Sequence, residues 1–229
     1  MQSFRALAPE EIVRTVDALR ERIDAAFPGS SLSGIASELG RVSREVRELA
    51  DWLARPLVWA RVLVGIGIVL LFAALIGALL RLHVDLRVKE LAELLQGVEA
   101  GVNNVVFLGI GLYFLWMLEA RLKRARALKS LHMLRSLAHI IDLHQLKKDP
   151  ESVSGGDRGG AELSPRELAR YLDHCGDMLT LIGKLAALHA QEFSDGPTLA
   201  VVQEVEDLSQ GLVRNIWQKI AIVDRVHAS

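Results

Sequence analysis

The chain has 229 residues, of which 51% are hydrophobic and 24% are charged, and its formal net charge is −1. This balance gives no sign of general nucleic-acid binding. The single cysteine, Cys175, excludes an intrachain disulfide and a zinc cluster built from several cysteines. The mean hydropathy of +0.26 is high for a chain with this much charge, so the apolar residues must be concentrated in particular segments.

Residues 1–56 are expected to form cytoplasmic helices. Apolar residues recur at helical spacing over residues 9–27, and "FPGSS" ends the pattern. A heptad seam of a coiled coil follows, with steps of three and four residues: Leu32, Ile35, Leu39, Val42, Val46, Leu49 and Leu53. Leu39, Val42, Val46 and Leu49 are its predicted interaction residues. The pattern leaves open whether they pack against another subunit or within the same chain.

Two uncharged runs predict transmembrane helices. The first, "VLVGIGIVLLFAALIGALL" at residues 62–80, is about long enough to cross a hydrocarbon core of roughly 30 Å, and we place this helix at residues 57–81. No basic and then apolar N-terminus precedes it, so an uncleaved anchor is expected. The second run, residues 100–118, has the same length but carries Asn103 and Asn104. Its Tyr113 and Trp116 suit a membrane interface.

Basic residues near the two runs predict the orientation, because lysine and arginine resist translocation. Those flanking the hairpin are Arg41, Arg44, Arg47, Arg55, Arg61, Arg121, Lys123, Arg124, Arg126, Lys129 and Arg135. Between the runs stand only Arg81, Arg87 and Lys89. The chain is therefore expected to be a multi-pass protein of the inner (plasma) membrane, with both termini in the cytoplasm. Residues 82–99 should form an external amphipathic helix.

The second run continues into a basic helix over residues 119–146. Arg121, Lys123, Arg124 and Arg126 are predicted to face lipid headgroups, because basic residues beside a membrane attract anionic lipids. Residues 147–163 collect Pro150 and four glycines, and they predict a flexible linker. No GK[ST] motif follows, which argues against a phosphate-binding loop.

Residues 164–229 predict a C-terminal helical hairpin. "SPRE" at residues 164–167 has the serine, proline and glutamate of a capped helix start, and "FSDGPT" separates this helix from a last one at about residues 198–226. The expected fold class is all-α: a two-helix transmembrane hairpin with a cytoplasmic helical bundle built from the N- and C-terminal segments.

The helix "LHMLRSLAHIIDLHQL" at residues 131–146 carries three histidines. At about 100° per residue, His132, Arg135, His139 and Asp142 fall within an arc of roughly 120°, which we call the polar stripe. His144 falls among the apolar residues and is expected to be a core histidine. The favoured interpretation is a buried or partner-facing stripe that fixes the register of the bundle.

A metal site is the alternative interpretation of this helix. His139 and Asp142 supply two groups, whereas a catalytic zinc needs at least three protein ligands and a structural zinc four. His174 and Asp177 in "YLDHCGD" repeat the same spacing, and His189 is a further candidate. A pH-sensing histidine pair is a third possibility. We predict no metal and no cofactor.

The run "FLGIGLYFLWMLEARLKRARALKSLHMLRSLAHIIDLHQLKKDPE", residues 107–151, resembles a segment of bacterial two-pass membrane proteins of unknown function. The resemblance covers about a fifth of the chain. It implies a bacterial inner-membrane protein and carries over no catalytic residue.

The leading functional hypothesis is a non-enzymatic membrane protein whose cytoplasmic bundle binds itself or an unknown protein partner, as a scaffold for assembly or signalling. The first alternative is a small oligomeric channel or transport component, because glycines in both runs allow close helix contacts and two spans cannot enclose a pore alone. The second is a membrane-bound metal-dependent hydrolase using His139, Asp142, His174 and Asp177. The expected partners are the lipid bilayer and further copies of the chain.

Overall fold

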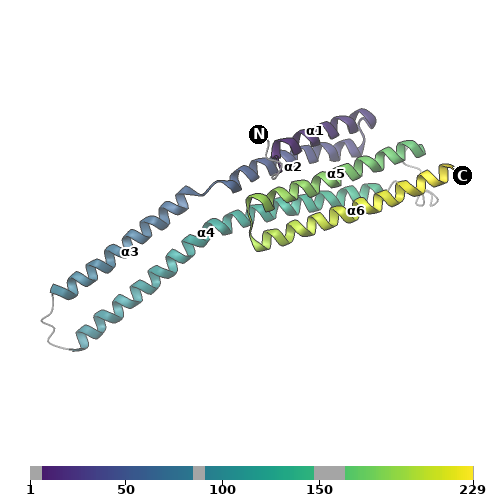
Figure 1. Ribbon diagram of the computed structural model, residues 1–229. Coiled ribbons are helices and arrows are strands. Elements are labelled where there is room, and N and C mark those ends of the chain that lie inside the picture. The colour runs from purple at the N-terminus through teal and green to yellow at the C-terminus, as the bar shows by residue number, and fades with distance from the viewer. Residues whose placement is uncertain (1–6, 85–90, 147–162, 229) are drawn as a thin grey trace. The chain divides into compact units, whose positions relative to one another are not determined.

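The computed structural model describes residues 7–84, 91–146 and 163–228. These residues form six helices and no strand, which confirms the all-α prediction. The helices are α1 (Pro9–Ala26), α2 (Ser31–Ala54), α3 (Val58–Val84), α4 (Leu91–Leu146), α5 (Pro165–Glu192) and α6 (Gly196–Ala228), and all are labelled in Figure 1.

The chain divides into two compact units. The bundle unit comprises residues up to Arg55 and from Arg124 onward, and the hairpin unit comprises Pro56–Lys123. Helix α4 contributes its first part to the hairpin unit and its last part to the bundle unit. Each unit is described separately below.

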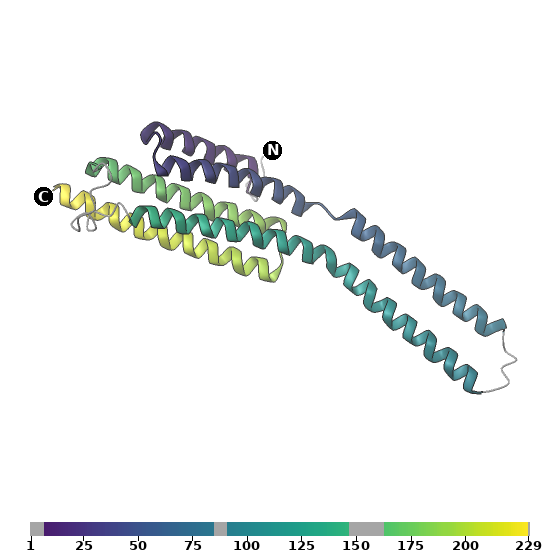
Figure 2. The same cartoon turned by 180° about the vertical axis from the view of Figure 1, so that it is seen from behind.

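The bundle unit is a helical bundle in which α1, α2, α5, α6 and the last part of α4 lie alongside one another (Figures 1 and 2). Polar contacts join neighbouring helices of the bundle unit. Asp17 of α1 meets Arg44 of α2 at 3.1 Å and Arg22 of α1 meets Asp177 of α5 at 3.7 Å. Along α4 and α6 the paired positions increase together, from Arg124–Asp195 to Arg135–Glu204, so these helices run parallel.

The heptad seam of α2 packs inside its own chain. Leu39, Val42 and Val46 are at most 1% exposed, and Leu49 is half-buried. Leu39, Val42 and Val46 belong to one core with residues of α1 and α5. The structure therefore places Leu39, Val42 and Val46 in the core of their own chain. The other option, contact of the seam with a second subunit, stays a prediction.

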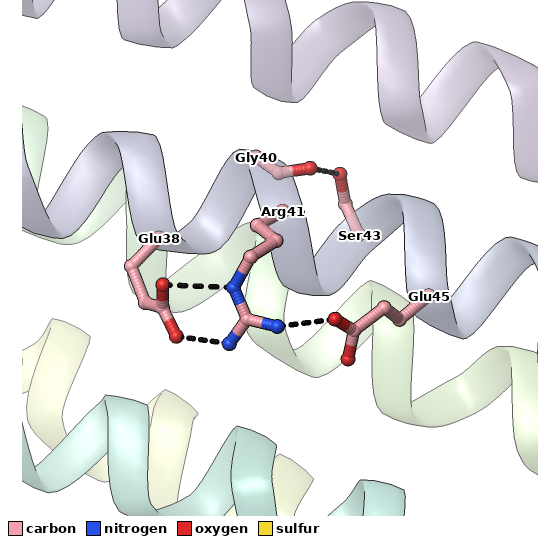
Figure 3. A network of polar contacts seen from close by, with 5 residues as sticks. All are labelled: Glu38, Gly40, Arg41, Ser43 and Glu45. Atoms are coloured by element: carbon pink, nitrogen blue, oxygen red, sulfur yellow. Dashed lines mark hydrogen bonds and ion pairs between the residues drawn. The ribbon is translucent and has the colours of Figure 1, made fainter.

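The opposite face of α2 is solvated. Arg41 lies between Glu38 and Glu45 and donates hydrogen bonds to both, as Figure 3 shows, and all three side chains are exposed. The Ser43 hydroxyl, buried on the other side, donates to the Gly40 carbonyl at 2.9 Å. Exposed pairs spaced by three or four residues each contribute only a few tenths of a kcal/mol, so α2 is held mainly by its apolar face.

The predicted capping box of α5 is present. The Ser164 hydroxyl accepts a hydrogen bond from the Glu167 N–H, and the Glu167 carboxylate accepts one from the Ser164 N–H at 2.8 Å. The predicted linker, residues 147–163, lies outside the described residues except for Leu163.

The external amphipathic helix predicted at residues 82–99 is described only in part. Helix α3 extends to Val84 and α4 begins at Leu91, so residues 91–99 continue directly into the second apolar run. Residues 85–90 lie outside the described part of the chain.

Candidate functional site

The polar stripe of α4 lies at the surface of the bundle unit. His132, Arg135 and His139 are exposed and Asp142 is half-buried, so the expectation of a buried stripe is wrong. The apolar side of α4 alone provides its core contacts, which leaves the polar arc in solvent. Arg135 pairs with Glu204 of α6 at 3.1 Å, and Asp142 accepts a hydrogen bond from Gln145.

His144 is also not a core histidine. Its side chain is half-exposed, and Nδ1 lies 2.9 Å from the carbonyl oxygen of Ile140 one turn earlier. The contact is with the backbone of its own helix. His144 therefore satisfies itself locally, and it does not position another element.

The proposed metal ligands have other neighbours. His174 is 7% exposed and its ring meets Phe27 edge-to-face at 6.2 Å, and burial lowers its pKa. Asp177 pairs with Arg22. Among the residues that the structure describes, no three His, Cys, Asp or Glu side chains gather in a way that could hold a metal ion. There is thus no point at which one metal ion could bind all four proposed ligands: His139, Asp142, His174 and Asp177.

The core face of α5 contains polar groups shielded from solvent. Cys175 is fully buried, and burial raises its pKa to about 12, which makes the thiol a poor nucleophile. His189 is 1% exposed, and its Nδ1 lies 3.1 Å from the Leu185 carbonyl oxygen. Its Nε2 has no hydrogen-bond partner among the described residues. The pKa of His189 is lowered by burial. These groups suit a packed interior.

The basic segment of α4 divides into paired and unpaired cations. Glu119 accepts from Lys123 at 3.2 Å. Arg124 binds Asp195 with two nitrogens at 2.7 and 2.8 Å, and its hydrogen bond holds the pKa of Asp195 below its usual range. Asp195 also accepts from the Thr198 hydroxyl. Lys123 and Arg124, both predicted to face lipid headgroups, are therefore engaged by protein carboxylates.

Arg126 and Arg121 instead lie against aromatic rings. The Arg126 guanidinium stands 4.2 Å from the centre of the Trp52 ring, and that of Arg121 lies 5.6 Å from the Phe114 ring. Both arginines are exposed. Trp52 was not among the predicted interfacial residues, although a tryptophan ten residues before an apolar run is a recognisable interfacial signal.

A groove along the α5–α6 pair was likewise not predicted from the sequence. Gly176 approaches Ile216, and Gly183 approaches Ser209, each with room for only a methyl group. An open groove of about 610 Å³ follows this line past Leu179, Val213 and the exposed Trp217. Small residues recur every seven positions on α5: Ala169, Gly176, Gly183 and Ala190. Only Gly183 among them lines the groove.

The hairpin unit exposes its apolar side chains. Phe72, Phe107 and Trp116 are 58%, 73% and 72% exposed. Within the described residues, one helix is long and apolar enough to cross a membrane: it lies in Gly101–Leu146, and none of its most apolar window is buried. The apolar stretch described in α3 is shorter, Arg61–Ala73. Gly67 allows Leu112 to approach α3 closely.

No family model, no curated protein and no solved structure matches this chain. The resemblance of residues 107–151 to bacterial two-pass membrane proteins therefore stays a prediction.

Proposed function

We propose that this chain is a non-enzymatic integral membrane protein, in which α3 and the apolar part of α4 form a two-pass hairpin and the bundle unit is a cytoplasmic scaffold. The main support for this proposal is that the hairpin unit exposes large apolar side chains. In α4, no part of the most apolar window is buried. The core helix of a soluble domain would bury such a window.

The polar groups of the hairpin unit support this proposal. Glu119 accepts from the Leu57 N–H at 3.3 Å and lies 3.5 Å from Arg61 Nε, so charged residues meet at the ends of α3 and α4. Between Val62 and Ile76 the described side chains of α3 carry no charge. A hairpin with charges at its base and an uncharged body suits a bilayer, whose hydrocarbon core spans roughly 30 Å.

Labelling of single cysteines tests this topology. Cys175 is buried and its thiol pKa is raised to about 12, so the native protein should give little background. In intact cells a membrane-impermeant maleimide should modify Gln96→Cys. Ser37→Cys and Ser194→Cys, both on exposed positions of the bundle unit, should react only after permeabilisation. Labelling of either bundle position in intact cells would overturn the proposal.

The channel or transport component is a second candidate because of Asn103. This side chain is exposed on α4 within the apolar run, and a polar amide is costly against lipid. In an oligomer it would face a neighbouring copy or a water-filled path. Conductance across planar bilayers containing the purified protein distinguishes this candidate from a scaffold, and Asn103→Leu should abolish the conductance.

The scaffold function rests on the surface of the bundle unit. Its polar stripe on α4 and its groove along α5 and α6 are open to solvent, and the described residues bring no metal-binding group together. A metal-dependent hydrolase thus has no observation in its favour. Purification with native partners retained, followed by identification of what co-purifies, tests whether the bundle unit binds another protein.

A further inference from the structure

The contact between Trp52 and Arg126 joins helices far apart in the sequence. Trp52 lies in the last turn of α2, and Arg126 lies near the start of the part of α4 that belongs to the bundle unit. The guanidinium stands over the indole ring at 4.2 Å. An aromatic ring attracts the charge of a guanidinium without using its N–H groups as hydrogen-bond donors, so these groups stay available to bind an acceptor.

Arg126 has no protein acceptor within the described part of the chain. Its neighbours differ: Lys123 pairs with Glu119 and Arg124 with Asp195. The fold thus neutralises two cations of one short segment and keeps the charge of a third, which it positions on an aromatic ring. Exposed arginines that serve only solubility need no such support.

Two further cations lie one helical turn from this pair. Arg55 follows Trp52 by three residues as the C-cap of α2, and Lys129 follows Arg126 by three residues on α4. Both are exposed, and neither has an ion-pair partner among the described residues. Glu48 and Asp51, four residues and one residue before Trp52, are the exposed acidic residues of this part of α2. Three cations, Arg55, Arg126 and Lys129, against these two carboxylates still leave the local charge positive.

We propose that Trp52, Arg55, Arg126 and Lys129 bind the phosphate of an anionic phospholipid headgroup. Arginine recognises phosphate through two parallel N–H···O bonds, and tryptophan favours the depth at which headgroups lie. The lipid source follows from position in the sequence. Arg55 stands three residues before α3 begins, and Arg126 stands eight residues, or about 12 Å of helix, after the uncharged run ends at Leu118.

The side-chain direction supports a lipid ligand. In a helix the Cα–Cβ bond tilts toward the N-terminus, and for Arg126 that is the direction of the apolar part of α4. The inference rests on the proposed membrane insertion of this part. It goes further by naming a headgroup phosphate as the ligand and Arg126 as the residue that contributes most.

Binding of short-chain lipids to the purified full-length protein in detergent tests the site. Dioctanoyl phosphatidylglycerol should bind, whereas dioctanoyl phosphatidylcholine and inorganic phosphate should bind much more weakly. Arg126→Gln should weaken phosphatidylglycerol binding by about tenfold or more, the usual effect of losing charged hydrogen bonds. Arg126→Lys should restore only part of it, because lysine keeps the charge without the planar fork.

Arg166→Gln is the matched control, since it removes the same charge from an exposed position in the first turn of α5. It should leave the affinity unchanged. An equal loss in Arg166→Gln and Arg126→Gln would overturn the site in favour of general charge attraction. Tight binding of inorganic phosphate that Arg126→Gln removes would overturn the lipid as its ligand. Thermal unfolding by circular dichroism verifies that each variant is folded.

The lipid-binding and cysteine-labelling experiments distinguish a failure of the headgroup site from a failure of the proposed topology. Cysteine labelling as predicted, together with equal binding by wild type and Arg126→Gln, would overturn the headgroup site and leave the membrane hairpin intact. Labelling of the bundle positions from outside would overturn the proposed topology whatever the lipid affinities are.

Discussion

Single residues of this chain show their role through what lies around them. Gly183 makes the clearest case, because it lines the α5–α6 groove beside Ser209 and has no side chain to fill it. A Cβ at this position would stand 3.9 Å from Ser209 Cβ, an ordinary van der Waals contact. The residue is therefore not required by sterics, and it costs the helix backbone entropy.

Gly183→Ala should stabilise the bundle unit by about 0.5–1 kcal/mol, because alanine fits this space and lowers the entropy of the unfolded chain. Urea unfolding followed by circular dichroism measures the change. Gly183→Leu is the contrasting variant: it should fill the groove and destabilise the pair of helices. A destabilised alanine variant would mean that α5 and α6 lie closer than described.

Because of His189, the free energy of unfolding of the bundle unit should depend on pH. Burial lowers its pKa below the usual 6.5, so the unfolded chain binds a proton more readily than the folded chain does. The stability that the bundle unit gains from keeping His189 neutral is fully present above about pH 6.5. It is lost as the pH falls from there toward the pKa of His189 in the folded state. Between about pH 7.5 and pH 5.5 this loss amounts to at most about 1.4 kcal/mol for one histidine.

His189→Leu should therefore reduce the difference between the unfolding free energies measured at these two pH values. His132→Leu serves as the control, because His132 lies at the surface, and it should leave that difference unchanged. An equal change in unfolding free energy between the two pH values in wild type and His189→Leu would contradict the prediction that buried His189 causes this pH dependence.

The helices themselves were predictable where the sequence carries local signals. The heptad spacing identified α2, and the serine, proline and glutamate of "SPRE" identified the start of α5, since capping is decided within four residues. The exposure of His139 and the stacking of Arg126 on Trp52 were not predictable. They depend on how helices separated by tens of residues are rotated against each other, and a helix pattern does not specify which part of its polar arc meets a neighbour.

The seam of α2 leads to a prediction for this element. Leu39 is 1% exposed within its own chain, so Leu39→Ala should destabilise the bundle by about 2–5 kcal/mol through the cavity that it leaves. Under conditions where the variant is folded, its mass in detergent should equal that of wild type. Light scattering combined with chromatography measures this mass. A fall in mass with an unchanged unfolding free energy would return the seam to a subunit interface.

The two units of the molecule distribute polarity in opposite ways. The bundle unit gathers apolar residues of its helices into one core and exposes charged faces such as that of Arg41, although single apolar residues such as Trp217 are also exposed. The hairpin unit exposes Phe72, Phe107 and Trp116. The high mean hydropathy of the chain thus reflects a local excess in the hairpin unit. Contacts between copies in a membrane need close backbone approach more than apolar area, because lipid is as apolar as leucine.

Self-association of the whole molecule should accordingly depend on Gly65. Gly67 faces Leu112 of α4, and Gly65, two residues earlier, points about 200° away around α3. It is exposed, and the space around it is open. A second copy could approach α3 closely there. Gly65→Leu should therefore lower the oligomer mass in detergent, whereas Val69→Leu, one turn along the same face, adds only a methylene and should not. An unchanged mass for Gly65→Leu would place any contact between copies elsewhere, with the polar stripe of α4 as the next surface to vary.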